Sequence, residues 1–230
     1  MAHNPAAGPA DETLPTGDVG RFPTGDVGRS PTGDAGRSPT GDAGRDRLLA
    51  AAVAAFGEKG FHATTTRDIA RAANLSPAAV YVHHPSKEDL LYLISIAGHL
   101  ELRAALEVAV AAADDPAGQL AALVRAFVTE HAARRDVARV VNDELDALSP
   151  EHRGEVDEHR RAMEKLVRDI IAAGVQRGDF VVADAHLTAR AVLSLGMDVA
   201  HWFRSPGRWS VATVAQEYAE LALRMVGAVR

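Results

Sequence analysis

Two helix N-capping signals separated by a tight turn set the fold of residues 64–91. Thr65 is followed three residues later by an acid, a variant of the capping box, so a helix should begin there. Asn74 suits the left-handed backbone of a tight turn, and Ser76 followed by Pro77 suits the start of a second short helix. Two short helices joined in this way can place the second one in a DNA major groove, although helical hairpins without a DNA role share the pattern.

Longer helices are expected on both sides of this pair. Apolar residues at helical spacing predict a first helix from about Arg45 to Glu58. Pro85 should end the second short helix, and Ser86 should cap a helix that continues to about Ala112. At about 1.5 Å per residue that helix is near 40 Å long, so it can connect the N-terminal helices to the rest of the chain.

The downstream sequence contains helical patterns and no convincing strand alternation. Helices are expected at 116–134, 136–148, 150–177, 184–203 and 210–226, with Gly178 and several Ser-Pro or Asp-Pro pairs marking the breaks. The predicted fold class is therefore all-α, with an N-terminal three-helix module over residues 45–91 joined by a long helix to a helical domain over residues 92–230.

Residues 1–44 are expected to form a disordered, low-complexity tail. Four tandem octads of the form PTGDVGRF, PTGDVGRS, PTGDAGRS and PTGDAGRD fill residues 15–46. Each octad contains one proline and two glycines and has hardly an apolar side chain, so it cannot offset the entropy of ordering its backbone. An arginine-bearing arm that samples DNA grooves is an alternative, but each octad balances its arginine with an aspartate.

Charge and composition narrow the class of protein. The net charge is −6, yet residues 45–91 carry six Lys and Arg against five acids, whereas the flanking segments are acidic. The chain has no cysteine, which excludes disulfides and thiolate metal sites. It also lacks a signal peptide pattern and an apolar run of about 18 residues, so a cytoplasmic protein without a membrane partner is expected.

The block Leu48–Leu91 resembles the DNA-binding module of the TetR (tetracycline repressor) family. The likeness rests on Phe56 with the following Glu and Gly, on the threonine-rich entry to the second helix, and on YVH at 81–83 followed by PSKE at 85–88. His84 departs from the family, which usually has Phe or another apolar residue there. The resemblance implies a homodimer that reads two DNA half-sites, paired through the last two helices of the chain.

The resemblance also implies which residues meet DNA. Hydroxyls, lysine and helix N-termini can donate to phosphates, and small apolar side chains can contact a thymine methyl group. The predicted DNA-binding residues are Thr66, Arg67, Ser76, Pro77, Ala78, Ala79, Tyr81, Val82, His83 and Lys87. Tyr81 could instead be half-buried, and Arg67 could pair with a neighbouring acid.

A ligand pocket in the helical domain is the further implication. The candidate lining residues, most of which could equally be plain core, are Phe127, His131, Val141, Leu145, Met163, Val167, Met197, His201 and Trp202. The spacing of the later motifs is similar to family members that respond to acyl-CoA thioesters or other lipid-derived compounds.

No enzyme motif, catalytic residue or cofactor site is found in the sequence. His152, Glu155 and His159 fall on one helical stripe and could bind a metal, but a solvated helix face is the better interpretation, and no metal site is predicted. The expected function is a transcriptional repressor released from its operator by a small molecule. The alternatives are a ligand-independent DNA binder or activator, and a small-molecule binding protein or enzyme with an idle DNA-binding module.

Overall fold

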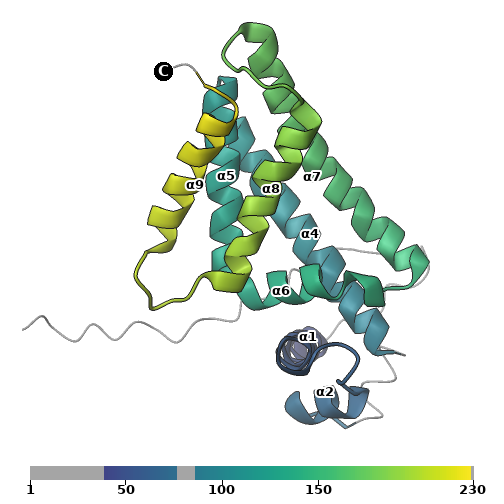
Figure 1. Ribbon diagram of the computed structural model, residues 1–230. Helices are drawn as coiled ribbons and strands as arrows, with labels where there is room; N and C mark the ends of the chain where they lie inside the picture. Colours follow the sequence, from purple (N-terminus) through teal and green to yellow (C-terminus); the bar gives the residue numbers. More distant parts are fainter. Residues whose placement is uncertain (1–38, 77–85, 229–230) are drawn as a thin grey trace, which may run out of the picture.

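The regular structure is entirely helical in the computed structural model, which describes residues 39–76 and 86–228 (Figure 1). No strand occurs in these ranges, which confirms the all-α prediction. Within them, no helix combines the length and apolar character needed to cross a membrane. The elements are α1 (Pro39–Lys59), α2 (Thr66–Ala72), α4 (Lys87–Ala111), α5 (Pro116–Ala133), α6 (Arg135–Asp143), a 3₁₀ turn (Leu145–Ala147), α7 (Pro150–Arg177), α8 (Ala185–Trp202) and α9 (Val211–Met225).

The predicted caps account for the helix starts near the N-terminus. The Thr65 hydroxyl accepts from the Asp68 backbone N–H at 3.1 Å, and the Asp68 carboxylate accepts from the Thr65 N–H at 3.1 Å, which completes the capping box. Asn74 has φ 55°, the left-handed conformation expected for the turn. The Ser86 side chain accepts from the Asp89 N–H at 3.0 Å, so α4 begins where its cap predicts.

Two helix boundaries differ from the expected ones. α1 begins at Pro39, six residues before the expected start and within the last octad, because extending a formed helix costs little and the proline has no N–H to leave unpaired. The helix expected over 136–148 ends at Asp143 and resumes as the 3₁₀ turn. Residues i and i+3 of a 3₁₀ turn share one side, so both Leu145 and Leu148 can be buried, each at 8% exposure.

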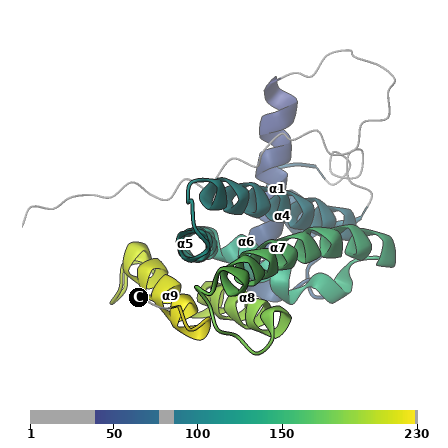
Figure 2. The same ribbon diagram turned by 90° about the horizontal axis from the view of Figure 1, so that it is seen from above.

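The buried side chains form two hydrophobic clusters. The first joins α1 and α2 to the N-terminal half of α4, to α6 and to the start of α7, with Phe56, Ile69 and Leu91 fully buried. The second lies in the helical bundle, where α5 packs against α4, α7, α8 and α9 (Figure 2). α4 contributes to both clusters, through Leu90 to Ile96 in the first and Leu106 in the second, and so joins them rigidly.

α6 lies between the bundle and α1 (Figure 1). It packs on α1 on one side and on α4 and α8 on the other. Gly57 of α1 faces Val140 of α6, where an added Cβ would lie 3.8 Å from the valine methyl group. α6 therefore touches both the N-terminal helices and the bundle.

Candidate nucleic-acid interface and interior cavity

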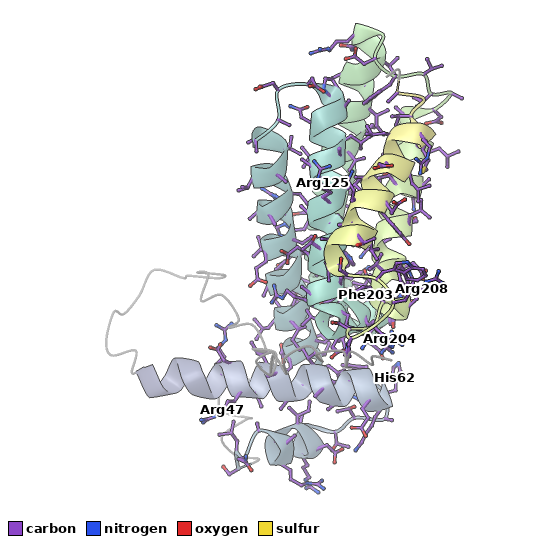
Figure 3. All side chains as sticks on the ribbon, turned by 90° about the vertical axis from the view of Figure 1, so that its left-hand side faces the viewer. Arg47, His62, Arg125, Phe203, Arg204 and Arg208 are labelled. Atoms are coloured by element: carbon purple, nitrogen blue, oxygen red, sulfur yellow. The ribbon has the colours of Figure 1, made fainter. Side chains whose placement is uncertain are left out.

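α2 carries two of the four described residues that are predicted to bind DNA, Thr66 and Arg67. α1 crosses beneath the bundle with α2 on its far side, and Arg47 of α1 is labelled in Figure 3. Thr66 is the first residue of α2, and Arg67 beside it is exposed and forms no ion pair within the described ranges. Ser76 is also exposed. The remaining predicted residues, except Lys87, lie outside the described residues: Pro77, Ala78, Ala79, Tyr81, Val82 and His83.

Lys87, the first residue of α4, points its ammonium group into the loop between α1 and α2. Its Nζ donates to the carbonyl oxygens of Phe61 at 2.6 Å, Thr64 at 3.0 Å and His62 at 3.2 Å. The same nitrogen lies 4.3 Å from the centre of the Phe61 ring. An ammonium group has three donors, so a phosphate contact would have to replace one of these bonds. The phosphate role of Lys87 stays a prediction, and its structural role is to hold this loop on α4.

The next residue, Glu88, ties α4 to the start of α7. Its carboxylate accepts from the Ser149 backbone N–H at 2.8 Å and from the Nδ1 of His152 at 2.9 Å. Tyr92, one turn further on, stacks on the His152 ring with 3.8 Å between centroids and donates its hydroxyl to Glu155. Partial burial and this carboxylate raise the pKa of Tyr92 to about 12, so the phenol stays a donor.

Two of the three residues on the helical stripe considered as a possible metal site, His152 and Glu155, belong to this junction. His152 and Glu155 are held by α4, and the pKa of His159 is lowered chiefly by burial. In the described chain, one group of three potential metal ligands lies within 4.8 Å: Glu88, Asp89 and His152. The carboxylates of this group already accept hydrogen bonds, from Ser149 and His152 and from the Ser86 hydroxyl.

A second junction joins α6 to the N-terminal helices. The Glu144 carboxylate, just after α6, accepts from the Phe61 backbone N–H at 2.9 Å. Phe61 belongs to the loop that Lys87 also holds, and its side chain is 6% exposed in the first hydrophobic cluster. This hydrogen bond therefore links the end of α6 to the loop that precedes α2.

Two adjoining hollows lie between α4, α5, α6, α7 and α8. The larger has a volume of about 150 Å³ and the smaller of about 50 Å³. We refer to these two adjoining hollows, which share Leu102, His131 and Asn142 in their linings, as the cavity. The other residues of the larger hollow are Phe127, Arg160, Met163, Glu164, Arg190, Leu193, Ser194 and Met197.

The structure gathers five of the nine predicted ligand residues around this cavity. Phe127, His131, Met163 and Met197 line the larger hollow, and Val141 lines the smaller one with His131. The other four predicted residues lie elsewhere: Val167 is fully buried in the bundle, Leu145 is in the first cluster, His201 is on the surface beside Asp143, and Trp202 faces a separate groove with Trp209 and Tyr218.

Sequence reasoning missed eight polar residues of the cavity: His99, Glu130, Arg134, Asn142, Arg160, Glu164, Arg190 and Ser194. His99 could have been found, because Ile96 and Leu102, three residues before and after it on α4, are apolar. Arg160 sits in a run dense with charge, which is typical of a solvated face, and nothing in that pattern marks it as a cavity residue.

The two cavity histidines are neutral donors and acceptors. The Nδ1 of His99 lies 2.8 Å from the Ser95 carbonyl oxygen, and the Nδ1 of His131 lies 2.8 Å from the Phe127 carbonyl oxygen. Burial lowers the pKa of His99 to about 4 and also lowers the pKa of His131. Each Nδ1 therefore carries the proton, and each Nε2 is left as an acceptor.

An apolar face remains uncovered on α8 and α9. Leu187, Leu195, Leu221 and Met225 are 66%, 44%, 40% and 37% exposed. Val199 of α8 and Val214 of α9 are buried in the bundle. The two helices thus present one side to the core and another to solvent.

The chain matches known proteins over nearly all of its helical part. Residues 48–92 match the family described as bacterial regulatory proteins, tetR family, and residues 113–226 match the tetracyclin repressor-like C-terminal domain. The transcriptional repressor KstR2 of Rhodococcus jostii is 31% identical over 76% of this chain and 87% of its own length.

Solved structures agree with this match. A tetR-family regulatory protein from Rhodococcus RHA1 is 43% identical, with a TM-score of 0.78 over 81% of this chain and 98% of the other. The ketosteroid transcriptional regulator KstR2 of Mycobacterium tuberculosis is 26% identical, with a TM-score of 0.74 over 81% and 95% of the two chains. On the strength of both domains and of these relatives, the chain belongs to the TetR family of transcriptional regulators.

Proposed function

We propose that this protein is a homodimeric repressor whose affinity for its operator falls when a small molecule occupies the cavity between α4 and α8. The observation that carries the proposal is the position of α6. Val137, Ala138 and Val141 of α6 line the smaller hollow, while Val140 packs on α1 and Glu144 holds the Phe61 N–H. One short helix thus has the cavity on one side and the DNA-binding module on the other.

The proposed switch works through the two junctions. A ligand that wedges α6 away from α4 shifts Glu144 and, with it, the loop before α2. α4 responds as well, since Lys87 and Glu88 clamp its first turn between that loop and α7. The ligand must prefer the conformation that no longer fits DNA, and moving from mostly bound to mostly released takes about 5.5 kcal/mol of differential affinity.

Dimerisation through α8 and α9 provides a second DNA-binding module, which contacts the second DNA half-site. Leu187 and Leu195 on one helix and Leu221 and Met225 on the other form an apolar face that a second copy can cover. A two-fold dimer places its two DNA modules on one side of the duplex, so the distance between them decides whether both fit successive major grooves.

The apolar part of the cavity lining, which includes Leu102, Phe127 and Leu193, supports a lipid-derived ligand, with an acyl-CoA thioester as one class. The cavity itself has room for a small apolar body, so the coenzyme of a thioester would have to remain outside it. The name of the M. tuberculosis relative, a ketosteroid regulator, agrees with an apolar effector.

A gel-shift assay with DNA flanking the protein's own gene tests the proposal. We expect sequence-selective, salt-sensitive binding, and we expect Arg67→Ala to reduce the dependence of log affinity on log salt by about one. Lys165→Ala, on the exposed face of α7, is the matched control. A thermal-shift screen of apolar metabolites should then identify a ligand, which at 100 times its Kd stabilises the fold by about 2.7 kcal/mol. A ligand that binds without weakening the DNA complex would contradict the repressor assignment.

A further inference from the structure

Arg160 of α7 is a half-buried cation at the wall of the larger hollow. Its guanidinium donates to the neutral Asn142 side-chain oxygen at 3.1 Å, and a second nitrogen lies 4.0 Å from the Met197 sulfur. Burial is the main cause that lowers the pKa of Arg160, but a guanidinium stays charged at neutral pH. Within residues 39–76 and 86–228, Arg160 forms no ion pair.

The acids nearest to Arg160 along α7 are held by other groups. Asp157 accepts from the Nε of Arg153 at 3.0 Å. Glu164, which lines the same hollow, pairs with His186 at 3.3 Å. A partly desolvated cation is costly unless it is paired. Arg160 donates to a neutral amide and a thioether, and the nearby Asp157 carboxylate acts on it electrostatically without a direct hydrogen bond.

The wall of the hollow in front of Arg160 has a polar side and an apolar side. The polar side also includes His131, Asn142, Glu164, Arg190 and Ser194. The apolar side consists of Leu102, Phe127, Met163, Leu193 and Met197. Its volume of about 150 Å³ is comparable with that of an engineered protein cavity that binds benzene. One ring or a short branched chain therefore fits beside the guanidinium.

We propose that this hollow binds a compact apolar carboxylic acid as the free anion, with its carboxylate on Arg160 and its hydrocarbon body against Phe127, Met163 and Leu193. The inference rests on the proposed ligand-controlled function and narrows its ligand class. A carboxylate accepts two parallel hydrogen bonds from a guanidinium, whereas a thioester or amide offers one neutral carbonyl oxygen. The ionised acid is therefore preferred over its neutral derivatives.

Isothermal titration of the full chain with cyclohexanecarboxylate, 3-methylbutanoate and cyclohexanecarboxamide tests this preference. We expect at least one acid to bind, and the matched amide to bind about 10 to 100 times more weakly. Arg160→Met should weaken acid binding by a similar factor and leave the amide nearly unchanged. Arg160→Lys should retain part of the acid affinity, because the charge remains but the planar fork is lost. Arg161→Met, the exposed neighbour on α7, should bind as the wild type does.

Circular dichroism and thermal melts show whether each variant is folded before its binding is compared. If acid and amide bind equally, if Arg160→Met binds the acid as tightly as Arg161→Met does, or if none of the three probes binds, the carboxylate assignment is wrong. A gel shift separates this failure from failure of the repressor assignment. Operator release by another ligand, with the same strength in Arg160→Met, would overturn only the carboxylate site.

Discussion

Gly196 lies where α8 packs closely against the Phe127 side chain of α5. A Cβ added there would lie 2.4 Å and 2.7 Å from two ring carbons of Phe127. The ring cannot easily move away, because Phe127 is 4% exposed and lies 4.2 Å, between centroids, from the His131 ring. Gly196→Ala therefore forces α8 outward or pushes the Phe127 ring into the ligand hollow.

The size of the effect follows from two opposing terms. Overpacking of this kind costs about 1 to 3 kcal/mol, and alanine in a helix interior recovers about 0.5 to 1 kcal/mol relative to glycine. We expect a net loss of about 1 to 2 kcal/mol in the free energy of unfolding. Gly154 of α7 is the matched control, since an added Cβ there meets nothing within 4 Å, and Gly154→Ala should stabilise by about 0.5 to 1 kcal/mol.

Urea unfolding at one fixed protein concentration measures both variants, because the expected dimer makes stability depend on concentration. Phe127→Leu in the Gly196→Ala background should restore part of the loss, and the double-mutant cycle should give a favourable coupling of about 1 kcal/mol. Gly196→Ala as stable as Gly154→Ala, or no coupling to Phe127, would refute the contact between α8 and α5.

Three further predictions concern the junctions and the buried histidine. Glu88→Ala should destabilise the fold by about 2 kcal/mol, because the Ser149 N–H and the His152 ring lose their acceptor. Its control is Glu151→Ala on the exposed first turn of α7, which should cost less than about 1 kcal/mol in the same urea assay. Lys87→Met should lower the stability of the DNA-free protein by about 1 to 2 kcal/mol, because three hydrogen bonds to the loop before α2 are lost. Lys59→Met at the exposed end of α1 is the control and should have little effect. An unchanged melting temperature for Lys87→Met would mean that Lys87 acts only in DNA binding. The pKa of His99 is about 4 in the folded protein and about 6.5 in the unfolded chain. The unfolded state therefore binds more protons as the pH falls. The free energy of unfolding should drop by about 2 kcal/mol between pH 7 and pH 5. Replacing His99 by Gln should flatten that pH dependence in urea titrations, and an equal slope would contradict the buried neutral state.

Local signals predicted the fold well because capping and turn formation depend on neighbouring residues. The Thr65 and Asp68 side chains need only each other's backbone, and Gly178 ends α7 with φ 78° as its position indicates. The contacts that build the junctions join residues far apart in the chain, such as Glu88 with His152 and Phe61 with Glu144. No spacing rule reveals such pairs.

The residues that line the cavity could likewise be predicted only in part, because packing between helices decides which side chains reach it. Helical periodicity shows which face of a helix is apolar, but the candidate pocket with Phe127 and Val167 followed from the family resemblance. Phe127 lines the hollow, whereas Val167 fills the core without reaching it. That difference depends on how four other helices pack on α5 and α7, which the pattern of one helix does not contain. Arg160 was missed for the converse reason, since a charged residue in a charged run is typical of a solvated face.

Selection of binding sequences from a random pool of DNA duplexes tests the central claim most directly, because it requires neither a known operator nor a known ligand. We predict enrichment of one sequence with two-fold symmetry, bound by a dimer with an affinity that falls steeply as salt rises. Binding that enriches no sequence over random competitor DNA would contradict the assignment of this chain as an operator-binding repressor.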